Sequence, residues 1–124
     1  MRAVLEGVAY GMRDSLELLR QLGVVAESAR ISGGGARSGL WVRMLASVLG
    51  LPLERAAVRE GAAFGAALLG GVAAGVFADV HEAVDACVHV HETVEPDEDW
   101  AAAYEAGYAR FRRLYPALRP LEES

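Results

Sequence analysis

The sequence predicts an α/β fold in which helices pack on a small sheet. Three features support this prediction: amphipathic segments with apolar residues three and four positions apart, short β-branched segments between them, and a glycine-rich turn after one of these short segments. The chain has 124 residues, and 53% of them are apolar, which is enough for one packed unit. We therefore expect a single domain over residues 1–124.

The first helix is predicted close to the N-terminus. Gly23 supplies its C-terminal stop, because glycine adopts the left-handed conformation at little cost. A strand is then expected from Ala29 to Ser32. The apolar side of the helix is formed by residues at helical spacing, namely Leu5, Val8, Met12, Leu16 and Leu19.

A second helix is predicted after the glycine-rich turn. Ser38 is a suitable N-cap, because its side chain can accept a hydrogen bond from a free backbone N–H of the first turn. Apolar residues continue at helical spacing as far as Leu49, and Gly50 with Pro52 ends the helix. Residues 53–58, from Leu53 to Val58, are a strand candidate.

Two further helices and a strand are predicted before the last helix. The run from Gly61 to Gly70 is rich in glycine and alanine, and we expect a helix there with Glu60 as a candidate cap. Asp79 is positioned to cap a short helix over residues 80–86. Valines then alternate with polar residues between positions 88 and 94, which is typical of a half-exposed strand.

The last helix is predicted to begin at Pro96 and Asp97. Pro116 and Pro120 are expected to end it, because proline lacks the N–H that a helix interior requires. Its aromatic side is interpreted as a packing surface and consists of Trp100, Tyr104, Tyr108, Phe111 and Tyr115. Asp14 and Glu17 on the first helix are interpreted as part of a solvated face.

Charge and hydropathy exclude two classes of partner. The formal net charge is −5, and the arginines are scattered, so a nucleic-acid surface is not expected. No segment is long and apolar enough to cross a bilayer, and no signal-peptide core is present, so we expect a cytoplasmic protein. The single cysteine, Cys87, agrees with a reducing compartment.

The glycine-rich turn is the main candidate binding site. Gly33, Gly34, Gly35 and Ala36 join a predicted strand to the helix that Ser38 begins. Without Cβ atoms the backbone can approach a ribose or a flat base. The Walker pattern is absent, and Ser38 occupies the third glycine position of the dinucleotide pattern. From the residues alone, a nucleotide site and a simple tight turn both remain open.

A metal site is the second candidate. Cys87, His89 and His91 alternate and would share one face of a strand. We favour an exposed polar face at these positions, because no fourth ligand is evident, although His81 or Glu92 could be recruited.

Several blocks together resemble the C-terminal third of the FGGY family of carbohydrate kinases, in particular its xylulokinases. The blocks are Leu5 to Asp14, Ile31 to Ser38 with Trp41, and Glu60 to Ala67. The resemblance implies two ribonuclease-H-like, actin-like domains that close on ATP and a sugar. It identifies this chain as a C-terminal nucleotide-binding fragment, and therefore a partial ribonuclease-H-like domain.

The resemblance also implies roles for individual residues. Gly34, Gly35 and Ala36 would lie along the adenosine, while Gly33, Arg37 and Ser38 would shape the turn. Gly39 stands where glycerol kinases carry an asparagine that contacts adenine, and glycine cannot make that side-chain hydrogen bond.

The implied activity of the parent protein is ATP-dependent phosphorylation of a ketopentose such as xylulose, with Mg²⁺ bridging the phosphates. The aspartate base, the sugar pocket and the first phosphate loop belong to an N-terminal domain that has no counterpart here. We therefore expect the isolated chain to be inactive. The alternative is a non-catalytic nucleotide sensor or oligomerisation module, and exposed sheet edges favour a homodimer.

Overall fold

The computed structural model describes residues 2–57 and 61–122. Helices and short strands alternate along this part of the chain, so the predicted α/β class is confirmed. Val58 and Glu60, which were predicted to end a strand and to cap a helix, lie outside the described residues. The elements in chain order are α1 (Arg2–Gln21), β1 (Ala29–Ile31), the 3-10 helix η1 (Gly34–Arg37), α2 (Gly39–Leu49), β2 (Leu53–Ala56), α3 (Gly61–Ala73), α4 (Val80–Cys87), β3 (Val90–Val94) and α5 (Glu98–Glu122).

The sheet is small and mixed, with the strand order β1-β2-β3. β1 and β2 run parallel, with Ala29 opposite Leu53 and Ile31 opposite Arg55. β3 pairs antiparallel with β2, and its Val94 also lies opposite Leu53. The register shifts between Arg55 and Ala56, where the ladder is irregular. β2 is therefore the central strand, and the carboxyl ends of β1 and β2 meet at one edge of the sheet.

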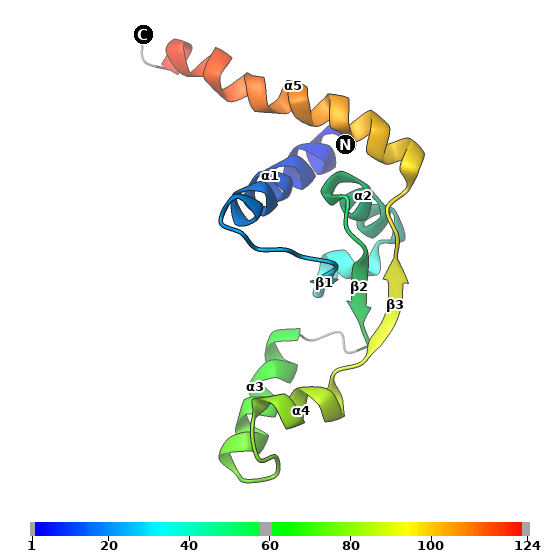
Figure 1. Cartoon of the computed structure of the whole chain (residues 1–124), viewed down its shortest axis with the longest axis vertical. Coiled ribbons are helices and arrows are strands. Elements are labelled where there is room, and N and C mark those ends of the chain that lie inside the picture. Colours follow the sequence, from blue (N-terminus) through cyan, green and yellow to red (C-terminus); the bar gives the residue numbers. More distant parts are fainter. Residues whose placement is uncertain (1, 58–60, 123–124) are drawn as a thin grey trace.

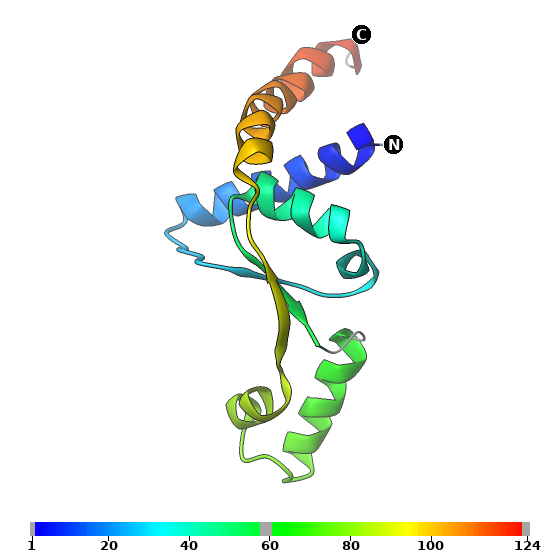
Figure 2. The same cartoon turned by 90° about the vertical axis from the view of Figure 1, so that its right-hand side faces the viewer.

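Helix α2 forms the centre of the hydrophobic core. Five of its apolar side chains are at most 3% exposed: Val42, Met44, Leu45, Ala46 and Val48. The helix contacts α1, α5, β2 and β3, and Figures 1 and 2 show α1, α2 and α5 gathered at one end of the sheet. Gly50 ends α2 with φ 64°, as predicted from the sequence.

Helix α5 begins at the predicted place but extends further than predicted. The Asp97 carboxylate accepts a hydrogen bond from the Trp100 backbone N–H at 2.9 Å and pairs with Arg43. The prediction that Pro116 and Pro120 end the helix is wrong, because α5 continues through both. These prolines lie in an exposed stretch, where carbonyl groups deprived of a helix partner can bind water.

Aromatic packing joins α1 to α5. Tyr10 of α1 is 8% exposed. Its ring centroid lies 6.2 Å from that of Tyr104, 6.0 Å from that of Tyr108 and 5.5 Å from that of Phe111. The predicted aromatic packing surface of α5 is therefore confirmed at these three residues, but not at Tyr115, which is 68% exposed.

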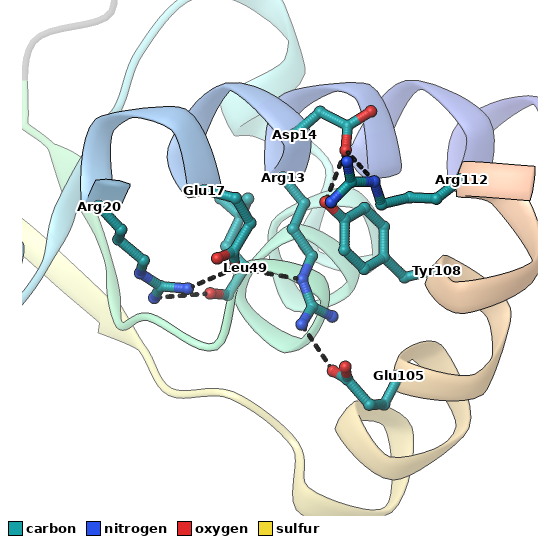
Figure 3. Close-up of polar contacts among 8 residues, drawn as sticks. All are labelled: Arg13, Asp14, Glu17, Arg20, Leu49, Glu105, Tyr108 and Arg112. Atoms are coloured by element: carbon teal, nitrogen blue, oxygen red, sulfur yellow. Dashed lines mark hydrogen bonds and ion pairs between the residues drawn. The ribbon is translucent and has the colours of Figure 1, made fainter. Parts of the chain in front are cut away.

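Polar contacts surround this aromatic cluster (Figure 3). Tyr108 donates a hydrogen bond of 2.6 Å to the Asp14 carboxylate, and Arg13 forms an ion pair of 2.6 Å with Glu105 of α5. Glu17 accepts a hydrogen bond from Arg20 at 2.8 Å. The interpretation of Asp14 and Glu17 as a merely solvated face is therefore wrong, since Asp14 binds α5 and Glu17 joins an ion-pair network beside it.

The predicted apolar side of α1 is only partly covered. The helix itself is confirmed, but its buried residues are Ala9 and Tyr10. Val8, Met12 and Leu19 are 50%, 47% and 46% exposed. The contacts of α1 with α2 and α5 thus cover a different strip of its surface, and an apolar strip stays open to solvent.

Helices α3 and α4 form a pair that stands apart from the other helices. Figures 1 and 2 show the pair at the opposite end of the sheet from α1, α2 and α5. None of the α3 residues is buried, although the helix is almost entirely apolar. Asp79 caps α4 as predicted, with its carboxylate accepting a hydrogen bond from the Glu82 backbone N–H at 2.9 Å.

Candidate functional site

The glycine-rich segment forms a strand-to-helix turn, as predicted, and contains a short 3-10 helix. Gly33 has φ 82° and ψ −167°, a conformation that is essentially restricted to glycine. The Ala36 N–H donates to the Gly33 carbonyl at 3.2 Å, and the Ser38 N–H donates to the Gly35 carbonyl at 3.1 Å. The turn is therefore an ordered structure with its own backbone hydrogen bonds.

The turn is attached firmly to the start of α2. The Ser38 hydroxyl accepts a hydrogen bond from the Trp41 N–H at 3.2 Å, which confirms Ser38 as the N-cap. A Cβ atom added at Gly35 would lie 3.1 Å from Nε1 of Trp41, so the indole packs tightly on this glycine. A Cβ atom at Gly39 would lie 3.8 Å from Nη2 of Arg55. Two of the predicted site residues, Gly35 and Ser38, thus also attach the turn to α2.

A cavity of about 530 Å³ opens beside the turn. It lies at the carboxyl ends of β1 and β2, which is where ligands bind in open α/β sheets. Of the predicted site residues, Gly33 and Ala36 line this cavity, whereas Gly34, Gly35, Ser38 and Gly39 do not. The full lining consists of Ile31, Ser32, Gly33, Ala36, Arg37, Arg55, Ala56, Ala57 and His91.

The polar groups of the cavity are mostly basic. Arg37, Arg55 and His91 line it, and no carboxylate does so among the described residues, although the chain carries a net charge of −5. Nη1 of Arg55 is held by Glu92 at 2.7 Å. Arg37 is exposed, and its guanidinium has no hydrogen bond or ion pair within the described ranges 2–57 and 61–122. Sequence reasoning did not consider Arg55 and considered His91 only as a candidate metal ligand, because only the sheet brings β2 and β3 to the turn.

A second, apolar cavity of about 350 Å³ lies between the turn and the α3–α4 pair. Phe64, Leu68, Val84 and Val88 supply much of its lining, while Ser32 and Ala56 line both cavities. A Cβ atom at Gly61 would lie 3.1 Å from the Ser32 hydroxyl, so α3 begins in direct contact with the turn region.

The candidate metal residues do not form a cluster. Cys87 ends helix α4, so the strand alternation that placed it beside His89 and His91 does not occur. Within the part of the chain that the structure describes, no group of three histidine, cysteine or carboxylate side chains could hold a metal ion. Across the same residues, no helix has the length and apolar character of a membrane span.

Comparison with known proteins identifies relatives over nearly the whole chain. The C-terminal domain of the FGGY family of carbohydrate kinases matches residues 1–74. A xylulose kinase of Staphylococcus epidermidis is 32% identical over 97% of this chain, which corresponds to 24% of the relative. A xylulose kinase of Escherichia coli is 38% identical over 97% of this chain and 25% of the relative.

A solved structure shares the architecture. Xylulose kinase from Rhodospirillum rubrum matches with a TM-score of 0.81 and 32% identity, over 99% of this chain and 25% of that protein. The prediction of a partial ribonuclease-H-like, actin-like fold is thereby confirmed. The chain spans about a quarter of the length of the curated relatives it matches. Because the family model matches more than half of the chain, this chain belongs to the FGGY family of carbohydrate kinases.

Proposed function

We propose that this chain supplies the adenosine-binding part of an ATP-dependent sugar kinase. In this proposal residues 1–124 are a C-terminal nucleotide-binding unit. The nucleoside lies along the turn formed by Gly33, Gly34, Gly35, Ala36, Ser38 and Gly39. The observation that carries the proposal is the cavity of about 530 Å³, which opens at this turn and at the carboxyl ends of two parallel strands.

The turn and its cavity fit a nucleoside in two respects. The cavity volume of about 530 Å³ lies within the range of about 300–1,000 Å³ that is typical of small-molecule sites. No atom lies within 4 Å of the positions that Cβ atoms would take at Gly33 and Gly34. The backbone therefore leaves open space into which a ribose or a base can come close.

For the parent protein we propose ATP-dependent phosphorylation of a ketopentose, with xylulose as the first candidate because the relatives named above are xylulose kinases. Mg²⁺ would be carried by the ATP phosphates. We place this reaction in the cytoplasm, where ATP and sugar phosphates are metabolised.

The isolated chain is proposed to lack turnover. Transfer to a sugar hydroxyl requires a base beside the acceptor and a metal on the phosphates. The described lining of the cavity offers no carboxylate for that purpose. The three quarters of the relatives' length that have no counterpart here are the proposed source of these groups.

Titration of the ¹⁵N-labelled chain with adenosine, ADP and ATP tests the binding proposal. Shift changes are expected at residues 32–39 and at the ends of β1 and β2. Ala36→Trp should abolish them, because the indole fills the cavity, whereas the matched change Ala103→Trp on the exposed side of α5 should leave them intact. The absence of any response in the wild-type chain, or a response elsewhere, contradicts adenosine binding here. Xylulose-dependent ATP turnover by the isolated chain contradicts the proposed inactivity.

An oligomerisation module is the second candidate, and the exposed apolar strip of α1 favours it. Val8 and Met12 are 50% and 47% exposed and lie one helical turn apart. If this strip mediates a homodimer, the wild-type chain dimerises in light scattering and Val8→Glu with Met12→Glu is a monomer. A wild-type chain that stays monomeric at high concentration excludes this candidate.

A further inference from the structure

Arg37 supplies an exposed positive charge to the cavity beside the turn. It is the last residue of η1, lines the cavity and is exposed. Across the described ranges its guanidinium has no hydrogen bond or ion pair. Arg55, the other arginine of the lining, is held at Nη1 by Glu92, and its Nε and Nη2 atoms are buried without a hydrogen-bond partner among the described residues, so this side chain is fixed in place. Arg37 is therefore the arginine that is free to follow a ligand.

The surroundings of Arg37 include apolar surface on which a flat base can lie, beside the basic side chains of Arg55 and His91. Phosphate sites are commonly built from clustered backbone N–H groups at a helix N-terminus. The start of α2 does not face this cavity, because Ser38 and Gly39 are absent from the lining and the Trp41 N–H is already bonded to Ser38. Apolar side chains make up much of the remaining lining, namely Ile31, Ala36, Ala56 and Ala57.

We infer that the guanidinium of Arg37 stacks on the purine base of the nucleotide. A guanidinium is planar, weakly hydrated and well suited to lie on an aromatic face. This inference rests on the proposed function, because it requires adenosine at the turn. It extends that proposal by assigning base recognition to a side chain, in addition to the glycine backbone.

Substitution of Arg37 tests the inference in the full chain. We expect Arg37→Ala to weaken binding of adenosine, ADP and ATP by the same factor, about tenfold, as is typical for loss of one stacking contact. Arg37→Lys should recover little affinity, because lysine keeps the charge and loses the planar face. Arg113→Ala on the exposed side of α5 removes the same charge and should change none of the three affinities.

An NMR signal gives a readout that does not depend on mutation. A purine stacked on the guanidinium should move the Arg37 Nε–H proton resonance upfield through the ring current, equally for adenosine and for ATP. Loss of affinity in Arg37→Ala that grows from adenosine to ATP, together with recovery by Arg37→Lys, overturns base stacking in favour of a phosphate contact. Unchanged affinity in Arg37→Ala also overturns the inference but leaves the proposed function intact. If the wild-type chain binds none of the three ligands, the proposed function fails as well.

Discussion

Replacement of Gly107 by alanine should destabilise the fold, even though alanine is the better helix former. A Cβ atom at position 107 would overlap the hydroxyl of Tyr10 and lie 3.0 Å from its Cζ atom. The Tyr10 ring cannot move away easily, because it is 8% exposed and packs against Tyr104, Tyr108 and Phe111. The added methyl group therefore forces α5 away from α1.

The magnitude follows from two opposing effects. Overpacking a close-packed contact costs about 1–3 kcal/mol. Alanine in place of glycine inside a helix stabilises the folded state by about 0.5–1 kcal/mol. The expected net loss in the free energy of unfolding is thus about 1 kcal/mol, within limits of about 0–2.5 kcal/mol. At Gly11 on α1, where no atom lies within 4 Å of an added Cβ, the same substitution should stabilise by about 0.5–1 kcal/mol.

Urea unfolding followed by far-UV circular dichroism measures both variants. Tyr10→Phe removes the overlapping hydroxyl and should relieve part of the loss, so the double variant Tyr10→Phe with Gly107→Ala completes a cycle. The reasoning is refuted if Gly107→Ala is as stable as Gly11→Ala, or if the effects of Tyr10→Phe and Gly107→Ala simply add.

Three further predictions concern the turn and the α1–α5 interface. Gly33→Ala should cost about 1–3 kcal/mol in urea unfolding, because φ 82° with ψ −167° strains any residue that has a Cβ atom. Ser38→Ala should cost about 1 kcal/mol through loss of the hydrogen bond from the Trp41 N–H, and Ser38→Asp, which keeps an acceptor, should cost less. Burial and the hydrogen bond to Asp14 raise the pKa of Tyr108. Because the pKa is raised by folding, the protonated Tyr108 hydroxyl contributes to the stability of the folded state. This contribution is fully present below about pH 10 and is lost as the pH rises through the folded-state pKa. Urea midpoints from pH 8 to 11 should therefore fall less in Tyr108→Phe than in the wild type, and parallel profiles would contradict this assignment.

The features that the sequence predicted correctly are mainly local. Ser38 and Asp79 each accept a hydrogen bond from the backbone N–H three residues later. Gly50, the residue after α2, adopts the left-handed conformation. Such contacts depend on three or four neighbouring residues, so residue type and spacing are sufficient to predict them. The glycine turn was also predictable from local sequence, because position 33 has a backbone conformation that few residues other than glycine adopt.

The features that were missed depend on contacts between distant segments. Tyr10 and Gly107 meet only because α1 and α5 pack together, and nothing near either residue indicates the other. Likewise, Arg55 and His91 reach the cavity through the order of the strands. The apolar side of α1 was predicted from residue spacing, but hydropathy alone does not show whether such a side is buried within the chain or open to solvent.

Under the proposed function, attachment of the turn to α2 makes nucleoside binding depend on other parts of the protein than catalysis does. The turn is fixed by the Ser38 cap and by Trp41 against Gly35, and α2 is the most completely buried helix among the described elements. The shape of the turn therefore depends on a core that this chain contains. Phosphoryl transfer instead requires the acceptor, metal and phosphates to be aligned at the same time, and positioning of this kind is lost entirely when part of a site is missing. A chain with this core should thus retain nucleoside affinity while lacking turnover, and fusion to the remaining part of a family member should restore turnover without changing the turn.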